Sequence, residues 1–210
     1  MNIELKYAVI GSIGTNCYIL KNTQTNEGVM IDTADNYDAA VSFIDRCNCT
    51  LKAILLTHGH YDHMTVARDI ADKYGVKIYA CEYEKHTLEN PDINLSSHMG
   101  RGGISMSADY WIKDGEELDI AGIKILAIHT PGHTEGGMSY YVKDLSSLFS
   151  GDTLFAESVG RTDFPTGSMS QIVSSVKDKL FKLPDDTIVY PGHGEGTSIA
   201  HEKAYNPFCQ

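Results

Sequence analysis

The chain has 210 residues, of which 42% are hydrophobic, and a formal net charge of −11 at pH 7. This length corresponds to about one domain, and the negative charge argues against nucleic acid and anionic membranes as partners. No apolar run in the sequence reaches the roughly 18 residues that a membrane-spanning helix needs, and residues 1–11 do not resemble a secretory signal. We therefore expect a single cytoplasmic domain over residues 1–210, whose oligomeric state the sequence does not indicate.

The sequence contains five cysteines, an odd number without paired spacing. This pattern favours reduced thiols in a cytoplasmic protein over a disulfide framework. Cys47 and Cys49 form the one close pair, at the end of a predicted helix. We interpret them as surface thiols rather than as a second metal site.

The first half of the chain alternates predicted strands and helices. Residues 3–10, 17–21 and 28–32 are expected to form an antiparallel meander with turns rich in Gly, Asn and Thr. Asp35 is a suitable cap for a helix whose apolar face includes Ala40 and Ile44, and a buried strand at 51–56 follows. A second helix, ended by Gly75, and a strand at 76–80 complete this half.

Residues 86–114 show weak periodicity and many Ser, Gly, Asn and Met residues. We predict a long loop, which in compact domains is either a substrate lid or a poorly packed insertion. Its candidate substrate contacts are His98, Arg101, Tyr110 and Trp111.

The second half repeats the mixed layout, with predicted strands at 117–120, 123–128, 138–142, 147–150 and 187–190. A helix is expected to begin at Ser168, where Gln171 completes a capping box, and a short helix ends the chain. Two mixed halves of this kind predict an α/β fold in which two sheets lie face to face with helices outside.

The segment THGHYDH, residues 57–63, directly follows the predicted strand at 51–56. It places four potential metal ligands, His58, His60, Asp62 and His63, within six residues. So many imidazoles beside a carboxylate repel one another and lose hydration unless a cation offsets the cost. Imidazole and carboxylate groups are also ligands that zinc prefers. The segment therefore predicts a metalloenzyme.

Three further candidate ligands follow predicted strands, each beside a glycine that allows a sharp turn. They are His133 in TPGHT, Asp152 in SGDT and His193 in YPGHG. His129 lies near this group, and we leave open whether it orients a ligand or packs as an ordinary core or turn histidine.

These motifs, in this order, resemble the metallo-β-lactamase-fold superfamily, and within it the glyoxalase II-like branch of hydroxyacylglutathione hydrolases. The similarity covers nearly the whole chain and rests on HGHYDH (58–63), HTPGHT (129–134), SGDTLF (150–155), GR (160–161), YPGHG (190–194) and EKAYNPF (202–208). It implies a four-layer αββα sandwich of two mixed β-sheets. It also implies one metal ion on His58, His60 and His133 and a second on Asp62, His63 and His193, with Asp152 bridging both. Arg161 in the Gly-Arg element is either a structural ion pair or a substrate anchor.

Several details distinguish branches of this superfamily. β-Lactamases of this fold are secreted and typically carry cysteine at the position of Asp152, and many lack a histidine at the position of His63, so antibiotic hydrolysis is disfavoured. The transfer-RNA-processing branch usually has a longer chain. The sequence also ends without the helical C-terminal extension through which full-length glyoxalase II holds glutathione, which leaves the thiol carrier open.

The expected reaction is hydrolysis of a small-molecule thioester, such as an S-acylglutathione or a related thiol ester. Two divalent ions, zinc first and iron or manganese as alternatives, would share a bridging hydroxide with a pKa lowered toward roughly 7. Asp62 is expected to be catalytic, either orienting this hydroxide or accepting its proton. A thiolate with a conjugate-acid pKa of about 8.5 leaves without a proton donor, whereas an amide nitrogen needs one.

The chief alternative is a persulfide dioxygenase, a class that shares the fold and resembles the chain around residues 160–164. Such enzymes hold one iron with two histidines and an aspartate, a set that His58 or His60, His133 and Asp152 could supply. A third class, a non-catalytic module with structural metal, fits less well because structural zinc sites are usually closed and rich in sulfur.

Overall fold

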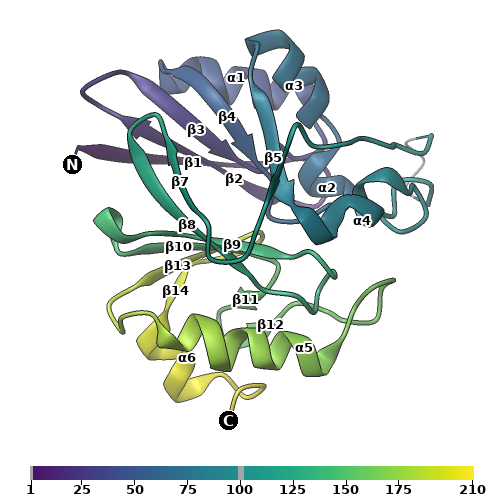
Figure 1. Cartoon of the computed structure of the whole chain (residues 1–210), viewed down its shortest axis with the longest axis vertical. Helices are drawn as coiled ribbons and strands as arrows, with labels where there is room; N and C mark the ends of the chain where they lie inside the picture. The colour runs from purple at the N-terminus through teal and green to yellow at the C-terminus, as the bar shows by residue number, and fades with distance from the viewer. Residues whose placement is uncertain (1, 99–101) are drawn as a thin grey trace.

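Two six-stranded β-sheets form the centre of the computed structural model, which describes residues 2–98 and 102–210. The first sheet has the order β1-β2-β3-β4-β5-β6 and the second the order β14-β13-β10-β9-β8-β7. Helices α1 and α3 cover the outer face of the first sheet, and α5 and α6 cover that of the second (Figure 1). The predicted four-layer αββα sandwich is confirmed.

The first sheet joins an antiparallel meander to a parallel part. Its strands are β1 (Ile3–Ile10), β2 (Thr15–Asn22), β3 (Glu27–Ile31), β4 (Thr50–Leu55), β5 (Lys77–Cys81) and β6 (Tyr110–Ile112). The strands from β1 to β3 pair antiparallel, while β3 to β6 pair parallel. The parallel pairs require crossover connections, which contain α1 (Tyr37–Cys47), α2 (Tyr61–Met64), α3 (Ala67–Tyr74) and α4 (Lys85–Glu89).

The second sheet is antiparallel except for one pair, β10 with β13. Its strands are β7 (Glu117–Ile120), β8 (Ile123–His129), β9 (Met138–Val142), β10 (Ser147–Gly151), β13 (Ile188–Pro191) and β14 (Thr197–Ser198). A small hairpin of β11 (Leu154–Phe155) and β12 (Ser158–Val159) follows β10. The crossover to β13 contains α5 (Met169–Ser174), and α6 (Ile199–Tyr205) follows β14.

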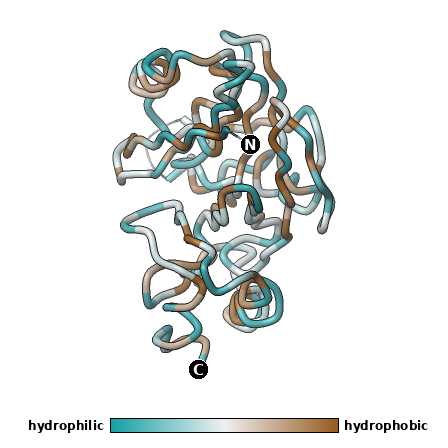
Figure 2. Tube along the Cα trace, turned by 90° about the vertical axis from the view of Figure 1, so that its left-hand side faces the viewer, coloured by the Kyte–Doolittle hydropathy of each residue, from teal (hydrophilic) through white to brown (hydrophobic). Residues whose placement is uncertain are grey.

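Three hydrophobic clusters occupy the spaces between the four layers. The middle cluster joins the sheets through side chains such as Leu20 and Leu55 of the first and Tyr140 and Phe149 of the second. The Tyr140 hydroxyl also donates to the carbonyl oxygen of Leu56 across this interface, at 2.7 Å. The outer clusters pack α1 and α3 on one sheet and α5 and α6 on the other. In the turned view of Figure 2, hydrophobic segments run through the interior of both halves and hydrophilic ones occupy many outer turns.

Some local expectations were wrong. Asn36, not Asp35, caps α1, because its side chain accepts from the Ala39 amide, whereas the buried Asp35 carboxylate accepts from the amide and hydroxyl of Ser12. Cys47, the last residue of α1, is buried in the first outer cluster and is not a surface thiol. All five cysteines lie in the described part of the chain and have free thiols.

The predicted loop over 86–114 is present between α4 and β6, where the described residues 90–98 and 102–109 form no helix or strand, but the two ends of the segment are regular structure. Residues Glu82–Glu84 form a 3₁₀ turn that leads into α4, and β6 pairs with β5 at the far end of the segment. Short elements of this kind give little periodicity in the sequence.

The helix that starts at Ser168 also differs in detail. Ser168 caps α5 as expected, but its own amide donates to the Gly132 carbonyl oxygen and so serves a neighbouring turn rather than the Gln171 side chain. After α5 the chain continues through a π-helical turn at Ser175–Lys179 and a 3₁₀ turn at Leu180–Lys182. None of the helices in the described ranges is long and apolar enough to cross a bilayer.

Candidate metal centre

All seven predicted ligands lie at one end of the sandwich, in turns that follow strands. His58 and His60 follow β4, and Asp62 and His63 lie in the short helix α2. His133 follows β8, Asp152 follows β10 and His193 follows β13. Each half of the chain therefore brings part of the set, and packing of the two sheets brings the parts together.

The side chains form three overlapping groups whose ligand atoms lie within 4.8 Å of one another. The groups are His58, His60 and His133; Asp62, His63 and His193; and His58, His63 and Asp152. The first two groups are the two triads that the sequence suggested. The third places Asp152 between them.

Distances within the cluster agree with this arrangement. In the first triad, His60 Nδ1 lies 2.9 Å from His133 Nε2. In the second, Asp62 Oδ2 lies 3.2 Å from His63 Nε2 and 3.1 Å from His193 Nε2. Asp152 reaches both triads, with one oxygen 3.6 Å from His133 Nε2 and the other 3.5 Å from His63 Nε2.

Hydrogen bonds behind the histidines fix which ring nitrogen faces the cluster. Nδ1 of His133 lies 2.8 Å from the Arg161 carbonyl oxygen, and Nδ1 of His193 lies 3.2 Å from that of Gly14. Since a carbonyl oxygen only accepts, each Nδ1 must carry the hydrogen, and each neutral ring presents Nε2 with a free lone pair. Metal-binding histidines are usually held in this way.

Asp32 orients two more histidines, one from each triad, so that their Nε2 atoms also face the cluster. One carboxylate oxygen lies 2.8 Å from His63 Nδ1 and accepts from the Thr57 hydroxyl at 2.7 Å. Because that hydroxyl has given its one hydrogen to Asp32, its oxygen must accept from His58 Nδ1, 3.1 Å away. The sequence reasoning missed this role, since Asp32 appeared there only as the end of a predicted strand.

We expect Asp32→Asn to weaken metal binding by roughly 10- to 100-fold, the range typical for partners behind metal ligands. Asn has nearly the same shape and tolerates the left-handed backbone of this residue, at φ 55°, so the substitution changes mainly charge and hydrogen bonding. Competition with a chromogenic chelator measures the affinity. Wild-type affinity in the variant would show that Asp32 does not control the histidines.

The protonation of the cluster follows from burial and from its own charges. Burial and the neighbouring imidazoles lower the pKa values of His58 and His60 well below the usual range, which keeps these rings neutral and able to bind metal. Burial opposes ionisation of His63, but Asp62, Asp32 and Asp152 outweigh it and raise its pKa. For Asp62, burial is outweighed by His63 and His193, which lower its pKa. The carboxylates that hold a proton on His63 are the negative charge that a divalent cation would offset.

The donor set fits a divalent metal ion. Among the described residues, His58 Nε2 and Asp152 Oδ1 are buried in this cluster without a hydrogen-bond partner. Buried polar atoms without partners are costly, and they are uncommon in folded proteins unless a ligand or ion completes them. The nitrogen and oxygen donors, together with the absence of sulfur from the groups formed by described residues, favour an open catalytic site over a closed structural one.

Two glycines leave room for the ligand turns. A Cβ atom at Gly192 would lie 2.2 Å from Asp152 Oδ1, and one at Gly132 would lie 2.3 Å from the Ile172 amide nitrogen. Gly132 has φ 135°, which other residues rarely adopt. Close approach to neighbouring groups therefore requires glycine beside both His193 and His133.

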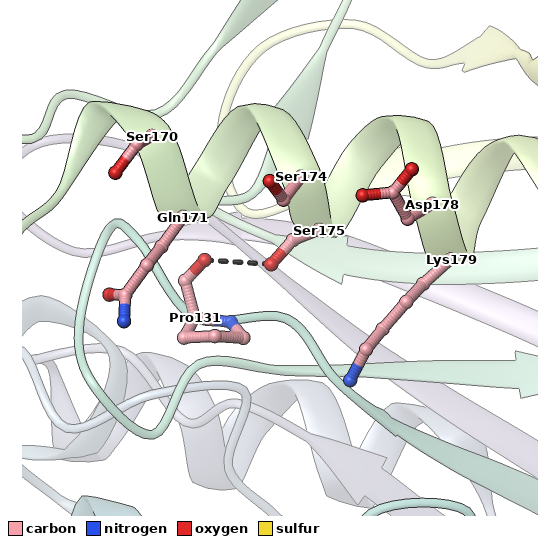
Figure 3. A pocket seen from close by; sticks show the side chains of 7 residues that line it. All are labelled: Pro131, Ser170, Gln171, Ser174, Ser175, Asp178 and Lys179. Atoms are coloured by element: carbon pink, nitrogen blue, oxygen red, sulfur yellow. Dashed lines mark hydrogen bonds between the residues drawn. The ribbon is translucent and has the colours of Figure 1, made fainter.

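The outer helix, which consists of α5 and the π-helical turn that follows it, packs behind the turn of His133. Figure 3 shows a groove between the helix and this turn, in which the Ser175 hydroxyl donates to the Pro131 carbonyl oxygen at 2.8 Å. Lys179 donates to the His129 carbonyl oxygen and to Asp114, both at 2.7 Å. Ser175 and Lys179 both belong to the π-helical turn. His129 itself stacks on Tyr83 and contacts the Glu135 carbonyl oxygen, away from the ligand cluster.

A cavity of about 530 Å³ opens onto both triads. Besides ligands, its wall consists mainly of apolar side chains that the sequence reasoning did not identify: Ile13, Tyr61, Leu95, Phe155 and Phe164. Leu95 has φ 70°, a backbone conformation that a branched apolar residue seldom adopts outside constrained sites. These residues come from separate segments of the chain, and no local pattern in the sequence connects them.

The suggested substrate contacts have different positions. Arg161 lines the cavity, but its guanidinium pairs with both Asp163 oxygens at 2.7 Å and lies 3.9 Å from the centre of the Phe164 ring. Tyr110 is not among the cavity residues; it lies in β6 and its hydroxyl donates to Glu116 at 2.7 Å. Trp111, also in β6, packs against the first outer cluster. Arg101 lies outside the described residues.

Comparison with known proteins indicates the same superfamily as the sequence motifs do. The family model described as the metallo-beta-lactamase superfamily matches residues 10–193. The chain is 34% identical to hydroxyacylglutathione hydrolase GloC of Haemophilus influenzae over 99% of this chain and 98% of that protein.

Two solved structures are also similar. BLEG-1 B3 metallo-beta-lactamase has a TM-score of 0.92 and 36% identity, covering 99% of this chain and all of that one, 100%. ETHE1 from Myxococcus xanthus has a TM-score of 0.78 and 28% identity, covering 99% of this chain and 84% of that one. With the matched ligand motifs and the αββα sandwich, these findings show that the chain belongs to the metallo-beta-lactamase superfamily.

Proposed function

We propose that this metallo-hydrolase superfamily member is a binuclear metal-dependent thioesterase of the glyoxalase II type. The observation that carries the proposal is the pair of triads joined by Asp152, since two adjacent metal positions are the arrangement that hydrolases use to activate water. The similarity to GloC supports a thioester of glutathione or of a related thiol as the substrate.

Bound divalent ions would supply hydroxide at neutral pH and polarise the substrate carbonyl. The protein's own residues prepare the site for this chemistry. Oxygen atoms of Thr57, Asp32, Arg161 and Gly14 accept from the outer ring nitrogens, so four Nε2 atoms face the cluster. Asp62 lines the cavity and contacts His63 and His193, a position from which its carboxylate can orient a water or accept a proton.

The cavity favours a thioester over an amide. A thiolate, with a conjugate-acid pKa of about 8.5, leaves without protonation, whereas an amine leaving group needs a proton donor. The apolar wall formed by Ile13, Leu95, Phe155 and Phe164 suits the acyl chain or the carbon skeleton of the thiol. We expect the site to bind mainly zinc, with iron or manganese as alternatives.

A persulfide dioxygenase is the second candidate, and the similarity to ETHE1 favours it. Within the cluster, His133 Nε2 lies 3.6 Å from Asp152, so two histidines and an aspartate are available for one iron. A single iron on that set would leave the second triad, with its buried Asp62 and His63, without a role. The second triad therefore favours the hydrolase.

The deciding experiment is hydrolysis of S-lactoylglutathione by metal-replete protein, with metal-depleted protein as control. We expect turnover that is lost on depletion and restored by zinc. Parallel assays measure oxygen uptake with glutathione persulfide and cleavage of a chromogenic cephalosporin, because one similar structure is a B3 metallo-beta-lactamase.

Each contrary outcome identifies a different function. Oxygen uptake without thioester hydrolysis would replace the proposal by a dioxygenase, and cephalosporin cleavage alone would replace it by a β-lactamase. Hydrolysis of other acyl thioesters but not of the glutathione ester would retain the reaction and reject the carrier.

A further inference from the structure

Glu84 is a buried carboxylate that the proposed reaction does not use. It ends the 3₁₀ turn Glu82–Glu84 after β5 and is only 1% exposed. Burial raises the pKa of Glu84 to about 7, although hydrogen bonds from Gly59, Thr134 and Gly136 oppose the shift. A buried ionisable side chain is expensive, so its contacts indicate what it contributes.

These contacts connect two ligand-bearing turns. Oε1 accepts from the Gly59 amide at 2.8 Å, and Gly59 lies between His58 and His60. Oε2 accepts from the Thr134 hydroxyl at 3.0 Å, and Thr134 directly follows His133. The Gly136 amide is a third donor, from the same turn as Thr134.

Both turns approach Glu84 closely, and at Gly136 the approach requires glycine. A Cβ atom at Gly136 would lie 2.3 Å from Glu84 Oε2 and equally close, 2.3 Å, to its amide nitrogen. A Cβ atom at Gly59 would lie 3.2 Å from Glu84 Oε1 and 3.1 Å from side-chain atoms of Thr87 and Leu88. The fold thus brings both backbones onto a single carboxylate.

We propose that Glu84 is a positioning residue for the first triad, whose carboxylate sets the distance between the turn of His58 and His60 and the turn of His133. The inference rests on the proposed metal centre. In the described part of the chain, the hydrogen bonds of the Glu84 carboxylate go to Gly59, Thr134 and Gly136 and not to α2 or to the turns of Asp152 and His193, so its loss should affect one metal ion more than the other.

Glu202 provides a matched control. It is also a fully buried carboxylate, 0% exposed, and it also accepts three hydrogen bonds, from the Glu157 amide, the Thr197 hydroxyl and the Asn206 side chain. These partners belong to α6 and its surroundings rather than to ligand-bearing turns. Glu202→Gln therefore reproduces the loss of a buried charge without disturbing the first triad.

The test is zinc titration of metal-free wild-type, Glu84→Gln and Glu202→Gln proteins against a chromogenic chelator, with thermal unfolding of each metal-free protein. In Glu84→Gln, an amide NH₂ replaces one acceptor oxygen, so at least one of the three donors loses its acceptor. We expect the wild type to bind two ions and Glu84→Gln to bind one of them about 10- to 100-fold more weakly, with the other unchanged. Glu202→Gln should lower the unfolding temperature but retain both affinities.

Thr134→Val removes one donor and leaves the carboxylate in place. It should weaken the same ion by a smaller factor, and it tests the inference if Glu84→Gln does not fold. The inference would be overturned if Glu84→Gln and Thr134→Val both bound the two zinc ions with wild-type affinity. It would also be overturned if Glu84→Gln and Glu202→Gln weakened the binding of both ions equally. Wild-type protein that bound no zinc would instead overturn the metal centre itself, a result visible before any variant is compared.

Discussion

Asp152→Ala is expected to abolish thioester turnover and to lower the metal content of the purified protein. Asp152 is the side chain that reaches both triads, at 3.6 Å from His133 and 3.5 Å from His63. Its removal leaves the imidazoles without the carboxylate that joins them. Because even partners behind a ligand cost about 10- to 100-fold in affinity or activity, removal of a ligand shared by two ions should cost more than about 1,000-fold in kcat.

Steady-state kinetics and elemental analysis of the same preparations test this expectation. Asp178→Ala is the control, since it removes an exposed carboxylate on the outer helix, away from the ligand turns. Both its activity and its metal content should equal those of the wild type. Retained turnover in Asp152→Ala would contradict the binuclear centre, whatever the substrate.

The second large effect is expected from metal removal. The ligands come from turns of both sheets, so a bound ion connects the two halves of the sandwich. An ion present at about 1,000 times its Kd stabilises the folded state by about 4 kcal/mol. For a chain of this size, each kcal/mol corresponds to about 2–4 °C in Tm, so chelation should lower Tm by about 8–16 °C per ion.

Differential scanning calorimetry with and without a chelator measures this shift. Added zinc should restore the original Tm, whereas magnesium, which prefers oxygen ligands, should not. An unchanged Tm after confirmed loss of metal would show that the histidine cluster is stable without a cation.

Much of the site could be predicted because its ligands occur in dense or repeated local patterns. His58 to His63 lie in one short segment, and the turns before His133 and His193 share the sequence Pro-Gly-His. Such patterns can be recognised in the sequence without any knowledge of the fold. The strands of the core were equally accessible, because alternation and apolar runs mark them directly.

Other parts depend on contacts between distant segments. Asp32 and Glu84 contact turns 25 residues away in sequence, and the same residues could serve as an ordinary strand end and an exposed turn in another fold. The strand β6 has three residues, too few for a period to be recognised. Asn36 rather than Asp35 caps α1, because the Asp35 carboxylate accepts hydrogen bonds from Ser12, which lies in a separate turn.

The ligand turns occupy one end of the sandwich, and two short connections between neighbouring strands lie at the opposite end. There, residues 23–26 join β2 to β3 and residues 143–146 join β9 to β10. Short surface connections tolerate changes in length at small thermodynamic cost. We therefore expect the connections 23–26 and 143–146 to accept insertions with little effect on the metal centre, unlike the turns that carry the ligands.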